Sequence, residues 1–223
     1  MTELKLTGGA RIGIANATWP FATLKVNKNR LDLNTGIIGN LSFSPRDIIS
    51  IEPYFMIPII GQGIKINHRV SKYSKKVIFW TFKNPNDVIN QIKQTGFLNN
   101  ISDSDNSTNN EIIKERQKQG GFPFKTPFAI TVVVIWNILF LIDFINFSKN
   151  NEKIPFGNGV IMALSFILII SILILVSNQF RKIVLKKGRE LKDISRFLYF
   201  IIIIAVFMLL NLSVFIKISN VFK

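Results

Sequence analysis

The first part of the chain alternates apolar and polar residues in short runs. Alternation with a period of two predicts half-buried β-strands. In the run at residues 21–28, for example, Ala22, Leu24 and Val26 share one face. Turn signals such as Thr35-Gly36 and Ser44-Pro45 separate the runs. We predict about seven strands, at residues 10–15, 21–28, 30–34, 38–43, 48–54, 63–70 and 76–82.

A helix is predicted directly after the last strand. Asn84 is a suitable N-cap, and Pro85 occupies the first helical position. Val88, Ile89 and Ile92 line one face, and Gly96 stands where a left-handed C-cap is favoured. The sequence therefore predicts a mainly β (α+β) fold, in which a seven-stranded, partly open barrel is capped by one amphipathic helix.

Three long apolar runs follow, at residues 127–147, 159–180 and 196–216. Each is close to the ~20 residues that a helix needs to cross ~30 Å of hydrocarbon. A soluble helix of this length would show a polar face, and these runs have too few polar residues to make one. We predict three transmembrane helices.

Composition supports this division of the chain. Of the 223 residues 48% are hydrophobic, yet 18% are charged, so the apolar residues are concentrated in particular segments. We expect a β-domain at residues 1–97, a polar linker at 98–126 and a membrane region at 127–223. The absence of cysteine excludes disulfides, thiolate catalysis and cysteine metal sites.

The placement of cations predicts the orientation in the membrane. Seven basic residues against two acidic ones lie at 181–196, between the second and third spans, whereas the loop between the first two spans has two against one. Cytoplasmic loops carry the excess of Lys and Arg. We therefore expect an integral multi-pass protein of a bacterial cytoplasmic membrane, with its N-terminal domain in the cytoplasm and its C-terminus outside.

Polar residues inside the spans are the candidates for a role beyond anchoring. Asn137 and Asn211 lie well inside the first and third spans, where amides often hydrogen-bond across helices. Asp143 lies about one turn from the outer end of the first span. An intramembrane carboxylate is a functional hypothesis, but at this depth we favour an acid that reaches the interface.

The first domain also resembles a known family. The segments GGARIGIANATWPFATLKVNKNRLDL, FSPRDIISIEPYFMIPIIGQGIKINH and VIFWTFKNPNDVINQIKQTGF resemble the bacterial pleckstrin-homology-like (PH/GRAM-like) domains, here joined to C-terminal transmembrane helices. The resemblance implies a seven-stranded barrel closed by a helix, and it does not imply an enzyme. Members that bind phosphoinositides place cations around the loop between the first two strands. We identify that loop as residues 16–20, which are uncharged, so a pocket of that kind is not expected.

A basic stretch in the domain is the candidate binding surface. Its cations are Lys65, Arg69, Lys72, Lys75 and Lys76. They fall on the outer face of a strand and at a hairpin tip, where lysines also simply protect a sheet edge. His68 is expected to be a satisfied, partly buried side chain, and Trp19 and Trp80 are expected to fill the core.

Three classes of partner could bind this surface. Nucleic acid fits the net charge of +15 but not the location, because many cations belong to the membrane loops. Anionic membrane lipid fits better, since each basic residue near the inner leaflet contributes ~1 kcal/mol. A protein partner or a second copy of the chain is the third. We expect a non-enzymatic interaction module without cofactor or metal; the alternative is an accessory subunit of a small channel or transport complex.

Overall fold

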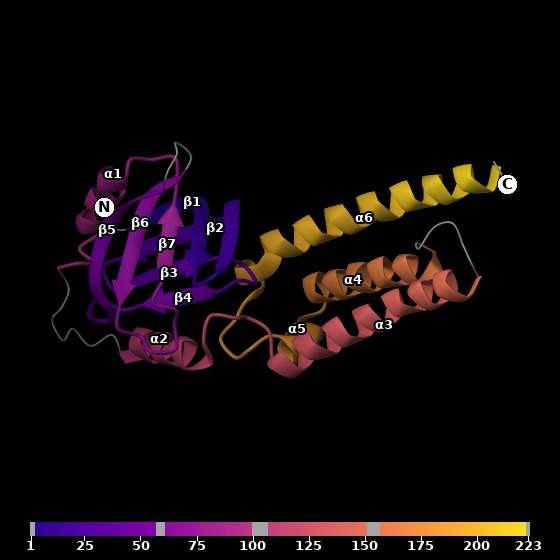
Figure 1. The fold of residues 1–223 in the computed structure, drawn as a ribbon. Helices are drawn as coiled ribbons and strands as arrows, with labels where there is room; N and C mark the ends of the chain where they lie inside the picture. Colours follow the sequence, from indigo (N-terminus) through magenta and orange to yellow (C-terminus); the bar gives the residue numbers. More distant parts are fainter. Residues whose placement is uncertain (1–2, 57–60, 100–106, 151–156, 222–223) are drawn as a thin grey trace. The chain divides into compact units, whose positions relative to one another are not determined.

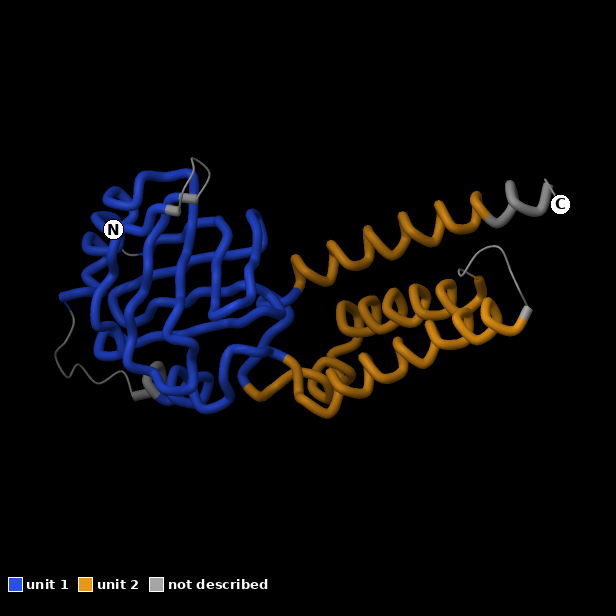
Figure 2. Tube along the Cα trace, viewed as in Figure 1, with its two compact units in different colours: residues 1–123, 188–194 blue, residues 124–187, 195–223 orange. Residues whose placement is uncertain are grey.

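The computed structural model describes residues 3–56, 61–99, 107–150 and 157–221. The chain divides into two compact units (Figure 2). Unit 1 comprises Met1–Pro123 and Gly188–Ile194, and unit 2 comprises Phe124–Lys187 and Ser195–Lys223. Unit 1 is therefore built from two stretches of chain that are separated by more than sixty residues of unit 2.

Unit 1 is a curled antiparallel half-barrel of seven strands (Figure 1), which confirms the predicted fold class. The strands are β1 (Glu3–Ile12), β2 (Ala15–Asn27), β3 (Arg30–Asn34), β4 (Asn40–Phe43), β5 (Ile48–Met56), β6 (Gly61–His68) and β7 (Val77–Trp80). A short 3-10 helix, η1 (Pro45–Asp47), joins β4 to β5. The strand order is β4-β3-β2-β1-β7-β6-β5, so β1 pairs with both β2 and β7 and holds the two halves together.

Alternation along the strands fills the concave side with apolar side chains. Leu24 and Val26 of β2 and Ile64 and Ile66 of β6 are fully buried, as their spacing predicts. Helix α1 (Pro85–Gln94) packs against β5 and β6. Phe97, just beyond the helix, is fully buried and belongs to the same core cluster.

The predicted caps of α1 are confirmed. The side chain of Asn84 accepts the amide of Asn86 at 2.9 Å, and Pro85 begins the helix. Gly96 has φ +76° and its amide donates to the carbonyl of Lys93 at 2.9 Å. A left-handed residue at this position ends the helix and turns Phe97 into the core.

The first strand differs from its prediction. Residues 10–15 do not form one strand, because β1 ends at Ile12 and β2 begins at Ala15. The connection is the tight turn at Gly13 and Ile14, where Gly13 has φ +63°. Residues 16–20, identified above as the loop between the first two strands, instead lie inside β2.

The segment expected to be a polar linker contains a helix, in the region where EIIKERQK (111–118) suggests a short one. Within it, α2 (Ser107–Gln119) is helical and packs on β4, burying Ile113 and Arg116. The side-chain nitrogen of Gln117 donates to the carbonyl of Ser42 at 3.0 Å and to the Asp47 carboxylate at 2.8 Å. These contacts fix the described part of the segment to the sheet, whereas residues 100–106 lie outside the described residues.

Unit 2 contains the apolar helices. Over the described residues, α3 (Thr126–Asn150), α4 (Asn158–Val176) and α6 (Leu191–Val221) are long and apolar enough to span a membrane, which indicates a membrane protein. Helices α3 and α4 pack as an antiparallel pair (Figure 1). The second span ends earlier than predicted, because Ser177 caps a separate short helix, α5 (Asn178–Val184), by accepting the amide of Phe180 at 3.2 Å.

Candidate functional site

The loop between β6 and β7 presents cations on a fixed backbone. Tyr73 at its centre is buried, with its ring edge-on to Phe43 at 5.4 Å between centroids. The amide of Arg69 donates to the carbonyl of Asp47 at 3.0 Å. Four basic side chains of the loop are exposed: Arg69, Lys72, Lys75 and Lys76. Among the described residues, no carboxylate lies within 4 Å of their charged nitrogens.

An exposed apolar side chain lies beside these cations. The amide of Gly13, in the β1–β2 turn, donates to the carbonyl of Lys76 at 2.8 Å. Ile14, the next residue, is 94% exposed. We call Ile14 together with the four exposed cations of the β6–β7 loop the basic tip. An exposed apolar side chain next to a loop with unpaired cations is suited to the interface of an anionic bilayer.

Lys65 does not belong to the basic tip. It lies within β6 directly opposite Glu52 of β5. Glu52 also accepts from Asn67 at 2.8 Å, so this face is a mixed polar row. Lys65 lies only four residues before Arg69, so the sequence alone does not separate it from the tip.

The aromatic predictions have different outcomes. His68 is buried and only partly satisfied: its Nε2 lies 2.9 Å from the carbonyl oxygen of Ser74, whereas its Nδ1 is buried without a partner. The prediction that Trp19 fills the core is wrong, since it is 56% exposed and contacts the exposed Phe82 at 6.1 Å between ring centroids. Trp80 is half-buried.

Among the described residues no group of three or more acidic or histidine side chains could hold a metal ion.

Asp143, near the end of the first span, has more hydrogen-bond partners than the two span asparagines. Its carboxylate is buried and accepts the backbone amides of Gly157 at 2.9 Å, Gly159 at 2.8 Å and Val160 at 2.7 Å. These amides form the N-terminus of α4, whose dipole favours a negative charge there. Asp143 of α3 thus caps α4 across the helix pair; we call this arrangement the Asp143 clasp.

Glycine is required for this close approach. A Cβ added at Gly159 would lie 2.4 Å from the backbone oxygen of Leu139 on α3, which is closer than atoms can pack. A Cβ at Gly157 would lie 3.1 Å from an Asp143 oxygen. The Gly-Asn-Gly sequence at the start of α4 was the available signal for the clasp.

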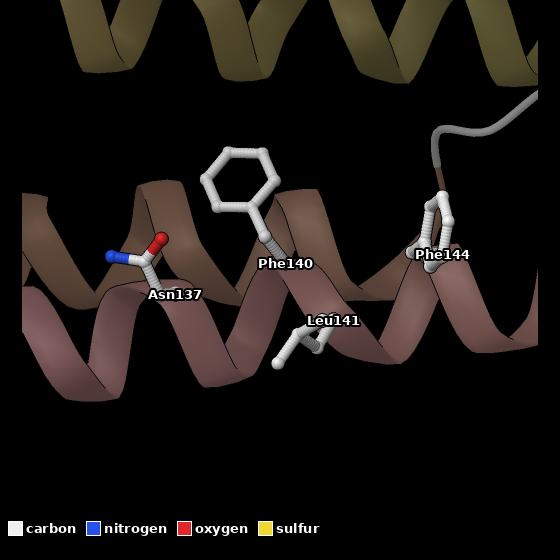
Figure 3. A pocket seen from close by; sticks show the side chains of 4 residues that line it. All are labelled: Asn137, Phe140, Leu141 and Phe144. Atoms are coloured by element: carbon white, nitrogen blue, oxygen red, sulfur yellow. The ribbon is translucent and has the colours of Figure 1, made fainter.

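The two span asparagines were expected to hydrogen-bond across helices, and within this chain they do not. The side-chain nitrogen of Asn137 donates to the carbonyl of Val133 at 2.7 Å, and that of Asn211 to the carbonyl of Phe207 at 2.7 Å, each within its own helix. Asn137, Phe140, Leu141 and Phe144 line a shallow, open pocket on α3 (Figure 3).

A second set of buried polar groups lies in unit 1. Arg189, from the short stretch Gly188–Ile194, is buried and donates to the carbonyls of Asn40 at 2.9 Å and Gly120 at 2.7 Å. Burial, and then the guanidinium of Arg116, lower the pKa of Arg189. Sequence reasoning missed this role, because Arg189 and Arg116 read as ordinary charges flanking the spans.

Comparison with known proteins finds no protein-family model, no curated protein and no solved structure that matches this chain. The structure itself shows the curled half-barrel and the three apolar helices.

Proposed function

We propose that this chain is a non-enzymatic, membrane-anchored module of PH-like build, whose basic tip binds the anionic surface of the membrane that anchors it. The observation that carries the proposal is the combination of four exposed, unpaired cations with the 94% exposed side chain of Ile14. Each cation near an anionic leaflet contributes ~1 kcal/mol, and the tether keeps the tip close to that leaflet.

The distribution of cations also favours placing the β-sheet unit on the cytoplasmic side of the membrane. Gly188–Ile194 belongs to the same compact unit as the β-sheet and lies within the cation-rich connection between the second and third spans. The sheet and that connection therefore share one side of the membrane. The excess of Lys and Arg supports placing that side in the cytoplasm.

The absence of cysteine provides a clean test. Ile14→Cys creates a unique site for an environment-sensitive dye on the full chain in lipid nanodiscs. We expect the dye emission to shift to the blue in nanodiscs with 30% anionic lipid, but not in neutral ones. Triple reversal of Lys72, Lys75 and Lys76 to Glu should abolish the shift, and so should 0.5 M salt, because exposed charges are screened.

Matched controls separate the tip from general charge. Lys65→Glu makes the same kind of reversal outside the tip and should leave the shift intact. A dye at Asn90→Cys, exposed on α1, should show none. A shift of equal size in neutral nanodiscs, or one that survives the triple reversal, would contradict lipid binding by the tip.

A protein partner is the second candidate, consistent with an accessory subunit of a transport complex. The observation in its favour is the exposed pair of Trp19 and Phe82, since aromatic side chains are the commonest anchors of protein interfaces. A photo-crosslinker at Phe82 in intact cells should yield one defined membrane-protein adduct, which Trp19→Ala removes. Adducts that are diffuse, or equal in the variant, would refute this candidate.

A further inference from the structure

Two arginines are buried in unit 1 without a carboxylate partner. Arg116 of α2 is 8% exposed and Arg189 is 7% exposed. In the part of the chain that the structure describes, neither forms an ion pair within 4 Å. A buried charge that lacks a counter-charge is costly, so proteins nearly always pair it.

Three of the buried polar atoms with spare hydrogen-bonding capacity are donors on these arginines and on Asn40. The terminal nitrogens of Arg189 are used on the carbonyls of Asn40 and Gly120. The Nε atoms of Arg116 and Arg189 and the side-chain nitrogen of Asn40 are buried and have no partner. Three orphaned donors, two of them on guanidinium groups, are complementary to an anion and not to a neutral or cationic ligand.

The nearest acids are engaged elsewhere. Asp32 accepts from Arg30 at 2.7 Å and from the hydroxyl of Ser42 at 2.6 Å. Asp193 accepts from Asn34 at 3.3 Å and from the amide of Glu190 at 3.0 Å. Both carboxylates favour the charged form of Arg189, but burial and Arg116 outweigh them, so the pKa of Arg189 is still lowered.

The two guanidiniums interact electrostatically. The positive charge of Arg116 disfavours the charged form of Arg189 and so contributes to lowering its pKa. Burial raises the pKa of Tyr73, and the charges of Arg189 and Arg116 both oppose that rise. Two like charges held together beside a buried phenol repel each other, and an anion between them would relieve the repulsion.

We propose that Arg116, Arg189 and Asn40 bind an oxyanion of the phosphate class, at a site separate from the basic tip. Guanidinium groups match the spacing of phosphate oxygens and bind them through paired N–H donors. Gly120 lies six residues before the first residue of α3, and Arg189 lies two residues before α6 begins. At no more than ~3.5 Å per residue, both residues are a short length of chain from an apolar helix, so a phospholipid phosphate and free inorganic phosphate are the two sources to test.

The first test uses the full chain, freed of lipid in a neutral detergent. Its thermal midpoint is followed as phosphate replaces chloride at constant ionic strength. A ligand that binds only the folded state raises the midpoint in a saturable way. We expect this rise in the wild type, and we expect the half-saturating phosphate concentration to increase at least tenfold in Arg189→Gln and Arg116→Gln. Lys93→Gln, an exposed position on α1 with the same loss of charge, should behave as the wild type.

The second test distinguishes the source. Native mass spectrometry of the full chain, released from nanodiscs containing phosphatidic acid, should show a retained lipid that is lost in Arg189→Gln but kept in Lys93→Gln. Retention with no response to inorganic phosphate assigns the site to a headgroup, and the reverse assigns it to the free ion.

Arg189→Lys replaces the glutamine variants if these do not fold. It keeps the charge but loses the guanidinium fork, so it should weaken phosphate binding. A wild type with neither a saturable phosphate response nor a retained lipid overturns the proposal. That result leaves the dye experiment on the basic tip unaffected, because the two sites share no residue.

Discussion

The Asp143 clasp makes a quantitative prediction. Asp143→Ala leaves the amides of Gly157, Gly159 and Val160 without their acceptor at a buried helix start. Loss of one N-cap costs about 0.5–2 kcal/mol. Loss of a charge from a partly buried helix N-terminus costs up to about 2 kcal/mol. The two effects together predict that opening of the first turn of α4 becomes easier by about 1–4 kcal/mol.

Hydrogen–deuterium exchange measures this opening locally. At about 1.4 kcal/mol per factor of ten, the amides of Gly159 and Val160 should exchange roughly 5- to 700-fold faster in Asp143→Ala. The measurement uses the full chain in nanodiscs and the peptide that covers the start of α4. Asp143→Asn keeps one acceptor oxygen but loses the charge, so its exchange should lie between those of the wild type and the alanine variant.

A matched variant shows whether the effect is specific. Asn137→Ala also removes a polar side chain from α3, but that side chain donates only to its own helix. Its exchange profile at the start of α4 should match that of the wild type. If Asp143→Ala changes exchange there by less than threefold, the clasp does not hold α4 and the reasoning fails.

Three further predictions follow from the structure. Gly159→Ala should separate α3 from α4 and cost about 1–3 kcal/mol by detergent unfolding, because its methyl group would meet the Leu139 oxygen at 2.4 Å, and Gly157→Ala should cost less. Asn137→Leu and Asn211→Leu should each change stability by less than about 0.5 kcal/mol, and a loss above about 1 kcal/mol would reveal a partner outside this chain. Tyr73→Phe should flatten the alkaline loss of stability. The raised pKa of Tyr73 means that the folded chain keeps a proton that the unfolded chain releases near pH 10, so stability is full below pH 10 and falls as pH rises further. Equal slopes between pH 9 and 11 in denaturant titrations of the two proteins would contradict this.

Local patterns accounted for most of the fold of unit 1. Burial of Leu24, Val26, Ile64 and Ile66 followed from strict alternation, and the caps of α1 from the residues at its ends. The tight turn at Gly13 was missed because the apolar–polar alternation of residues 10–15 continues straight across it. A period-two pattern does not register a two-residue turn.

The errors at the candidate sites have a common origin. Each depended on contacts between segments far apart in the sequence. Lys65 lies opposite Glu52 on a neighbouring strand, and Asp143 is buried by the start of another helix. Helix α2 carries one buried apolar residue, Ile113, and one buried arginine, which is too weak a pattern to predict packing. Such pairings require the tertiary arrangement.

The assignment of Gly188–Ile194 to the β-sheet unit has a consequence for biosynthesis. The ribosome completes the sheet long before it synthesises Arg189, so the domain acquires its last piece only after two apolar helices have been made. That piece reaches the sheet only if those helices enter the bilayer as a hairpin and return the chain to its starting side. Completion of the domain therefore depends on correct insertion of the two helices. In a chain inserted with the wrong topology, the carbonyls of Asn40 and Gly120 lack their arginine donor. The domain surface would then open more easily and become a substrate for quality-control proteases.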